Sequence, residues 1–237
     1  MKTSTIASHY VRSAIAGAIA QGFDVKTLLA KAGIGMDILD EPKARVYPDT
    51  LSKLLRVLAT ELKDEFIGQD DKPSTPGTFG ILCHLLVDCS TLREALDIGT
   101  RYYGLFDMAL HVQFQNEENT NSGSLVVIEN RPCLNKDNYL TEYQLMLWHR
   151  LSCWLTGKRI PIKVSEFAYD KPAHADEFKL FFFGDNTFNM PRTLVRIEKQ
   201  YLDLPIVRDR TDLPELMKEA PYVFLVKPNN TTSINAQ

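Results

Sequence analysis

The spacing of hydrophobic residues changes near residue 107, and this change constrains the fold more than any other feature of the sequence. Before it, apolar residues recur at helical spacing, most clearly at Leu51, Leu54, Leu55, Leu58 and Leu62. After it, every second residue is apolar, at Met108, Leu110, Val112 and Phe114. A helical opening followed by strands predicts an α+β fold, with an N-terminal helical part and then an antiparallel sheet packed with helices.

Local signals divide each part into elements. Thr91 and Glu94 form a capping box at the start of one helix, and Gly157 is expected to end a long one. The expected helices are 6–19, 25–32, 48–62, 79–87, 92–106, 138–156 and 173–183. The expected strands are 108–115 and 124–129, which form a hairpin, followed by 162–169 and 193–198.

Composition excludes several classes of protein. The 237 residues carry a net charge of −3, which argues against a protein that coats nucleic acid with clustered lysine and arginine. No apolar run approaches the roughly 18 residues of a membrane span, and the N-terminus lacks the apolar stretch of a secretory signal. We therefore expect a cytoplasmic protein that makes no use of the membrane, with one large domain or two small ones sharing a core.

The cysteines and histidines do not predict a metal site. Cys83, Cys89, Cys133 and Cys153 form no CxxC pair, and no histidine stands at ligand spacing from them. Glycine-rich phosphate loops and the GxSxG nucleophile turn are also absent from the sequence. These observations predict no metal, no cofactor and no enzyme activity, with the cysteines as buried thiols.

The long helix carries the sharpest candidate site. Glu142, Leu145, His149 and Cys153 follow one another along one stripe, so Glu142 and His149 lie two turns, or about 10 Å, apart. A molecule held over this stripe could contact both groups. A competing hypothesis is that they are the acid and base of an enzyme, although no nucleophile motif or metal-ligand spacing supports it. The alternative is that Glu142 is solvated and His149 is a core residue bonded to the backbone.

An aromatic group forms the second candidate site. Phe79, Tyr102, Tyr103 and Phe106 could line a pocket, with Arg101 as an anchor for a small carboxylate or an acyl chain. Helically spaced aromatic residues also form ordinary core. The residues that we expect to bind a ligand are Phe79, Arg101, Tyr102, Phe106, Glu142 and His149.

The order of short motifs along residues 5–207 resembles a known family. The motifs are LLAKAGI at 28–34, DEPKARV at 40–46, FGIL at 79–82, TLREAL at 91–96, RYY at 101–103, Glu142, Lys163-Val164 through Pro172, and YLDLP at 201–205. Together they resemble the N-terminal effector-binding and dimerisation domain of AraC/XylS-type transcription regulators, closest to the ornithine-utilisation regulator subgroup.

The resemblance implies a bacterial cytoplasmic regulator that senses a small-molecule effector and acts as a homodimer. DNA would be contacted only through a C-terminal module of about a hundred residues with two helix-turn-helix units, which is expected to be missing here. Residues 1–207 would form the regulatory domain and 208–237 a linker toward that module. The helical opening does not resemble the cupin barrel of the arabinose regulator, so no sugar-binding residues are carried over. A protein-interaction or dimerisation domain without a metabolite is the alternative.

Overall fold

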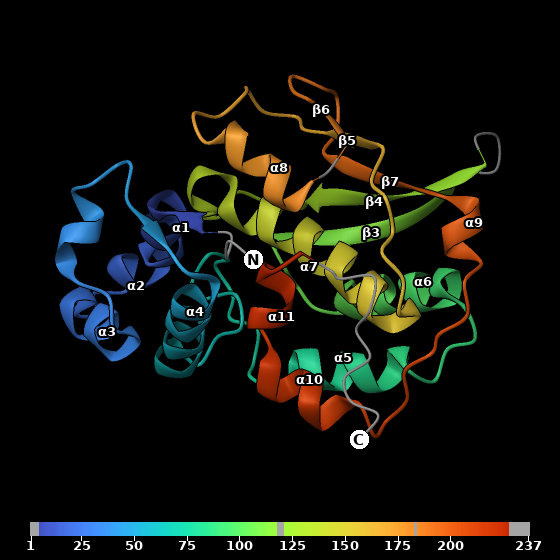
Figure 1. Ribbon diagram of the computed structural model, residues 1–237, viewed down its shortest axis with the longest axis horizontal. Coiled ribbons are helices and arrows are strands. Elements are labelled where there is room, and N and C mark those ends of the chain that lie inside the picture. The colour runs from blue at the N-terminus through green and yellow to red at the C-terminus, as the bar shows by residue number, and fades with distance from the viewer. Residues whose placement is uncertain (1–4, 118–120, 183, 228–237) are drawn as a thin grey trace.

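The structure is a computed structural model that describes residues 5–117, 121–182 and 184–227 (Figure 1). Its helical part contains α1 (Ser8–Ala14), α2 (Ala16–Ala20), α3 (Val25–Ala32), a 3₁₀ turn (Met36–Leu39) and α4 (Pro48–Leu62). The short strands β1 (Ile6–Ala7) and β2 (Arg45–Val46) pair with each other. Ile6 therefore lies in a strand, although the sequence predicts a helix there. Further along lie α5 (Thr78–Leu86) and α6 (Leu92–Tyr103).

Five strands form one open sheet in the order β3-β4-β7-β5-β6. They are β3 (Leu110–Glu117), β4 (Ser122–Glu129), β5 (Val164–Glu166), β6 (Asp185–Thr187) and β7 (Leu194–Glu198). The α+β class is confirmed, and the sheet is not closed into a barrel. The prediction of an antiparallel sheet is wrong for one pair of strands, because β6 runs parallel to β5. Between them the chain crosses back through a 3₁₀ turn (Ala175–Glu177) and α8 (Phe178–Phe181), as parallel neighbours require.

Helix α7 (Tyr139–Thr156) runs through the middle of the molecule, between the sheet and the C-terminal helices in Figure 1. Its first turn is capped by Asn135, whose Oδ1 accepts hydrogen bonds from the N–H groups of Leu140 (2.9 Å) and Thr141 (3.3 Å). Its end at Gly157, which is left-handed with φ of 60°, matches the prediction. Only Tyr143 and Leu147 of this helix are not buried, and they lie four residues apart on one face.

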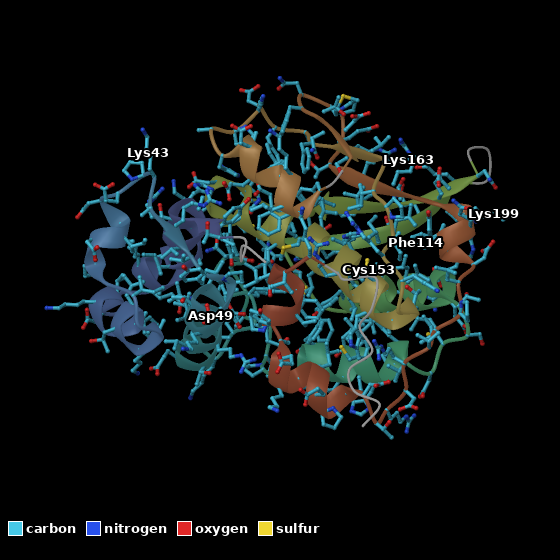
Figure 2. All side chains as sticks on the ribbon, viewed as in Figure 1. Lys43, Asp49, Phe114, Cys153, Lys163 and Lys199 are labelled. Carbon is cyan, nitrogen blue, oxygen red and sulfur yellow. The ribbon has the colours of Figure 1, made fainter. Side chains whose placement is uncertain are left out.

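The interior is continuous across both parts. Figure 2 shows Cys153 inside the molecule, whereas Lys43, Lys163 and Lys199 extend from its surface. After β7 come α9 (Lys199–Leu202), α10 (Leu213–Glu219) and α11 (Tyr222–Leu225).

The segment expected to be a linker folds back onto the domain. Helix α10 contacts α5, and α11 contacts α4 and α7. The side chains of Leu213, Leu216, Phe224 and Leu225 are buried by these contacts. Residues 208–227 are therefore packed against the body of the domain, while 228–237, the rest of the expected linker, lie outside the described residues.

Candidate functional site: an aromatic cavity

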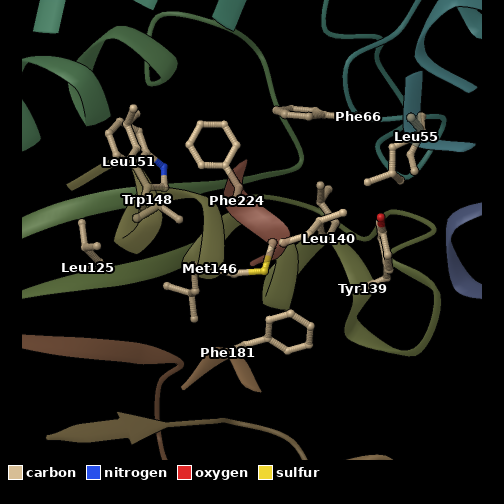
Figure 3. Packing of buried hydrophobic residues seen from close by; sticks show 14 of the residues in the cluster. Leu55, Phe66, Leu125, Tyr139, Leu140, Met146, Trp148, Leu151, Phe181 and Phe224 are labelled. Carbon is tan, nitrogen blue, oxygen red and sulfur yellow. The ribbon is translucent and has the colours of Figure 1, made fainter. Parts of the chain in front are cut away.

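A cavity of about 170 Å³ lies between α4, α7, α11 and the loop that follows α4. Several of its lining side chains, including Tyr143 and Leu147, are only half-buried, so the cavity opens to solvent. Its lining residues are Leu55, Arg56, Ala59, Glu65, Phe66, Ile67, Phe79, Tyr103, Tyr139, Leu140, Tyr143, Gln144, Leu147, Ala220, Pro221 and Phe224. Figure 3 shows Leu55, Phe66, Tyr139, Leu140 and Phe224 around this space.

Six aromatic rings supply much of the wall, and they come from well-separated parts of the chain. Phe79 of α5 meets Phe224 of α11 edge to face, with ring centroids 5.8 Å apart. Tyr139 and Tyr143 of α7 stack with their planes at 9°, and Phe66 contacts Tyr103 of α6 at 6.1 Å. A concave, mainly aromatic wall with few polar groups is typical of small-molecule sites.

Two tyrosines bring hydroxyl groups to this wall without a protein partner. Tyr103 and Tyr139 are 6% and 4% exposed. Among the described residues, no group forms a hydrogen bond with either hydroxyl. Burial raises the pKa of both, so each remains a neutral donor. Neither hydroxyl oxygen is among the fully buried side-chain atoms of the described residues that lack a partner, so both can be reached by solvent or by a molecule in the cavity.

Glu65 adds the one carboxylate among the lining residues. Its two oxygens accept hydrogen bonds from the N–H groups of Gly77 (2.8 Å) and Phe79 (2.9 Å). Burial raises the pKa of this carboxyl, and the two N–H donors oppose the shift. These two bonds fix the carboxylate between the loop after α4 and the start of α5.

Asp64 explains why the loop has this shape. Helix α4 ends at Leu62, and the residue that follows it, Lys63, is left-handed with φ of 54°. The buried Asp64 side chain then accepts hydrogen bonds from the N–H groups of Phe66 (2.9 Å), Gly68 (2.7 Å) and Ser74 (2.7 Å). This arrangement satisfies three loop donors and presents Glu65 and Phe66 to the cavity.

Arg56 lies at the exposed rim of the cavity. Its guanidinium donates a hydrogen bond to the main-chain carbonyl of Lys218, which joins α4 to α10. Gln144 on the opposite wall donates to the carbonyl of Leu110 at 3.3 Å. The cavity therefore has one charged group at its rim, one carboxylate in its wall and two tyrosines whose hydroxyls have no partner among the described residues.

Glu142 occupies a different place, on the side of α7 that faces α1. It is 4% exposed and is neither solvated nor part of the aromatic cavity. Its oxygens accept from the hydroxyls of Tyr10 and Tyr169, both at 3.2 Å, and lie 2.9 Å from Nε2 of His174. Burial raises the pKa of Glu142, and the His174 contact opposes that shift. The carboxylate thus binds protein groups that tie three segments together.

His149 is a core residue bonded to the backbone, as the alternative interpretation expects. It is fully buried, and its Nε2 lies 2.8 Å from the carbonyl oxygen of Ile160. Burial lowers its pKa to about 3. Because Glu142 and His149 have separate partners and neither lines the aromatic cavity, they do not form an acid–base pair.

Of the predicted aromatic group, Phe79 and Tyr103 line the cavity, whereas Tyr102, Phe106 and the proposed anchor Arg101 do not. Tyr102 is half-buried and donates to the carbonyl of Thr78 at 3.3 Å, and Phe106 is exposed and contacts its ring. The side chain of Arg101 is 75% exposed and pairs with Asp97 at 3.2 Å, so it does not reach the cavity.

Of the six residues predicted to bind a ligand, Phe79 lies in the cavity wall, whereas the lining residues Glu65, Tyr139, Tyr143 and Phe224 were not predicted. The spacing of Tyr139, Tyr143 and Leu147 at four-residue intervals could have indicated a common face of the helix. Nothing indicated Phe224, because its segment reads as a linker.

Neither a metal site nor a membrane span is found in the described parts of the chain. Across residues 5–117, 121–182 and 184–227, no three His, Cys, Asp or Glu side chains are grouped so that they could hold a metal ion. Within the same ranges no helix has the length and apolar character needed to cross a bilayer. Cys83, Cys89 and Cys153 are buried free thiols and Cys133 is a half-buried one.

The chain is similar to known transcription regulators. One solved structure similar to the chain is the transcriptional regulator CdpR from Pseudomonas aeruginosa, at 9% identity and a TM-score of 0.46. The match covers 86% of this chain and 59% of CdpR, so the chain spans less than two thirds of that protein. No curated protein sequence matches the chain. The family model for the N-terminal arabinose-binding domain of AraC transcription regulators matches residues 22–206, and the chain therefore belongs to this family.

Proposed function

We propose that this domain senses a small-molecule effector for an AraC-type regulator and that the effector binds in the aromatic cavity. The observation that carries the proposal is an open, mainly aromatic cavity lined by Tyr103 and Tyr139, whose hydroxyls have no hydrogen-bond partner among the described residues. Empty apolar cavities of roughly 150 Å³ can bind a molecule of the size of benzene. A space of about 170 Å³ suits one ring or a short alkyl chain with a hydrogen-bonding group.

A sugar does not suit this wall. A pentose presents hydroxyl groups on every side, and the aromatic faces of Phe66, Phe79 and Phe224 would leave many of them unpaired. We therefore propose an effector that is mainly apolar. The absence of an acid–base pair at Glu142 and His149 favours binding over catalysis.

Helix α11 supports a way for the effector to act on the rest of the regulator. Ala220, Pro221 and Phe224 form the wall of the cavity that lies nearest the C-terminal end of the described chain. An effector that contacts Phe224 binds one position of α11 better than others, which shifts the population toward that position. In a full-length cytoplasmic regulator that acts as a homodimer, as the family resemblance implies, this shift would change how DNA-binding modules are presented.

The regulatory domain in this proposal extends through α11, beyond the boundary at 207 expected from the sequence. Of the residues predicted to bind ligand, Phe79 is retained, whereas Glu142 and His149 are assigned to the stability of the interior. Arg101, Tyr102 and Phe106 lie beyond the cavity wall.

A thermal-shift screen of small aromatic and aliphatic amines, alcohols, acids and sugars tests the proposal. A binder present at 100 times its Kd should stabilise the protein by about 2.7 kcal/mol. Leu147→Trp, which fills the cavity mouth, should abolish this gain. Leu85→Trp, the same change at an exposed position of α5, should leave it intact. If no compound of the library stabilises the protein, or if ligands stabilise the Leu147→Trp variant equally, the proposal is overturned. It is also overturned if arabinose proves to be the ligand that binds best.

A further inference from the structure

The polar end of the cavity combines a carboxylate with aromatic rings. Glu65 accepts two main-chain hydrogen bonds and forms no ion pair with any cation of the described residues. Glu65 lines the same cavity as Tyr103 and Tyr143. Burial raises the pKa of both phenols, and the Glu65 charge adds to that shift. The cavity thus has negative potential at one end.

The rings around this carboxylate add to that potential. The face of an aromatic ring carries partial negative charge and attracts cations within about 6 Å. Phe79 and Phe224 meet edge to face at 5.8 Å, and Tyr139 and Tyr143 stack parallel, so the walls present both faces and edges. Aromatic cages are a known solution for binding quaternary ammonium groups.

Arg56 is the one cation among the lining residues, and it forms no ion pair with Glu65. Arg56 is exposed at the rim, and its guanidinium is engaged by the carbonyl of Lys218. Arg101, which the sequence suggested as an anchor for an anion, points to solvent beside Asp97. An anionic ligand would therefore meet the carboxylate of Glu65 without a buried cation to balance it.

We propose that the effector is an organic amine cation: a compact apolar body, of one ring or a short alkyl chain, with an ammonium group held by Glu65 and the surrounding rings. The ammonium donates to the Glu65 carboxylate, and the apolar body packs on Phe224 and Leu140. The hydroxyls of Tyr103 and Tyr139 remain available to a further acceptor or to water. This inference rests on the proposed function and adds the chemical class of the ligand.

Three probes of similar shape separate charge from shape. They are 2-phenylethylamine, 2-phenylethanol and phenylacetate, which are cationic, neutral and anionic at pH 7.5. Calorimetric titration of the protein should show the amine binding at least about tenfold more tightly than the alcohol, a ratio that corresponds to roughly 1.4 kcal/mol. Phenylacetate should bind most weakly.

Glu65→Gln should bring the amine-to-alcohol ratio close to one while the affinity for the alcohol stays within about threefold. Glu61→Gln is the matched control, because Glu61 lies one turn earlier, pairs with Lys31 and does not line the cavity. If Glu65→Gln does not fold, Phe224→Leu keeps an apolar wall and removes a ring, and it should weaken the amine more than the alcohol.

The results also separate this inference from the proposed function. Equal or tighter binding of the alcohol or the acid, or a ratio unchanged in Glu65→Gln, would overturn the amine class while the cavity remains an effector site. Absence of binding by all three probes, while other compounds of the library bind, would also overturn the amine class. Absence of binding by every compound of the library would overturn the effector site itself.

Discussion

Phe79 and Phe224 pack edge to face, with ring centroids 5.8 Å apart and planes at 85°. One ring comes from the first part of the domain and the other from the short helix that ends its described chain. Their contact closes the wall of the cavity, so the C-terminal segment is a structural component of the candidate site.

Removing the Phe224 ring should destabilise the domain. Its side chain is buried, and replacing a buried phenylalanine with alanine costs about 3–5 kcal/mol through lost burial and the cavity left behind. Urea unfolding of Phe224→Ala measures the loss. Tyr222→Ala, on the same helix but only half-buried, should cost clearly less. Equal losses in the two variants would mean that the ring contributes nothing specific.

His149 should make the domain sensitive to acid. Its pKa is about 3 in the folded protein against an ordinary value of 6.5, so between these values the unfolded chain binds more protons than the native one. The stability that neutral His149 provides is therefore complete above about pH 6.5 and is lost as the pH falls toward 3. The loss amounts to several kcal/mol, since each pKa unit is worth about 1.4 kcal/mol.

Urea unfolding at a series of pH values, for the native sequence and for His149→Gln, checks this. Glutamine can still donate to the Ile160 carbonyl but does not titrate, so its stability should fall less steeply between pH 6.5 and 4. Carboxyl groups contribute to both proteins and cancel in the difference. Identical slopes would show that His149 does not control the acid response.

Glu142 and His174 should be energetically coupled. They lie 2.9 Å apart, and both are almost fully buried. Removing one side chain leaves the other buried without the interaction that its partner provided. A double-mutant cycle with Glu142→Gln and His174→Gln should give a coupling energy of at least about 1 kcal/mol. The exposed pair Lys179 and Asp176 provides a control, for which we expect a value near zero.

Arg101→Ala should leave both ligand binding and stability nearly unchanged. The side chain is exposed and, among the described residues, pairs only with Asp97 one turn away, a contact worth about 0.3–0.5 kcal/mol. Calorimetric titration with a ligand found in the screen, together with thermal unfolding, measures both properties. A large loss of affinity would restore Arg101 as an anchor for the effector.

Local signals in the sequence predicted local structure well. The helix expected at 48–62 has those bounds, because Pro48 occupies its first turn and leucines mark its buried face. The capping residue Thr91 accepts from the N–H of Glu94 at 3.3 Å, as predicted. These features depend on residues a few positions apart, and a pattern of neighbours contains that information.

The candidate site depends on contacts between distant residues, and the sequence does not contain those in readable form. Tyr143 could be assigned to a helix face, but not to a cavity shared with Glu65 and Phe224. The parallel pairing of β5 and β6 was missed for the same reason, since the direction of a three-residue strand is decided by the crossover before it.

A single helical turn has almost no stability in isolation. Helix α11 has four residues, and two of them, Phe224 and Leu225, are inserted into the body of the domain. The turn therefore exists only while those two side chains stay in place. Any molecule that changes how firmly they are held also decides whether the backbone there is helical or unwound.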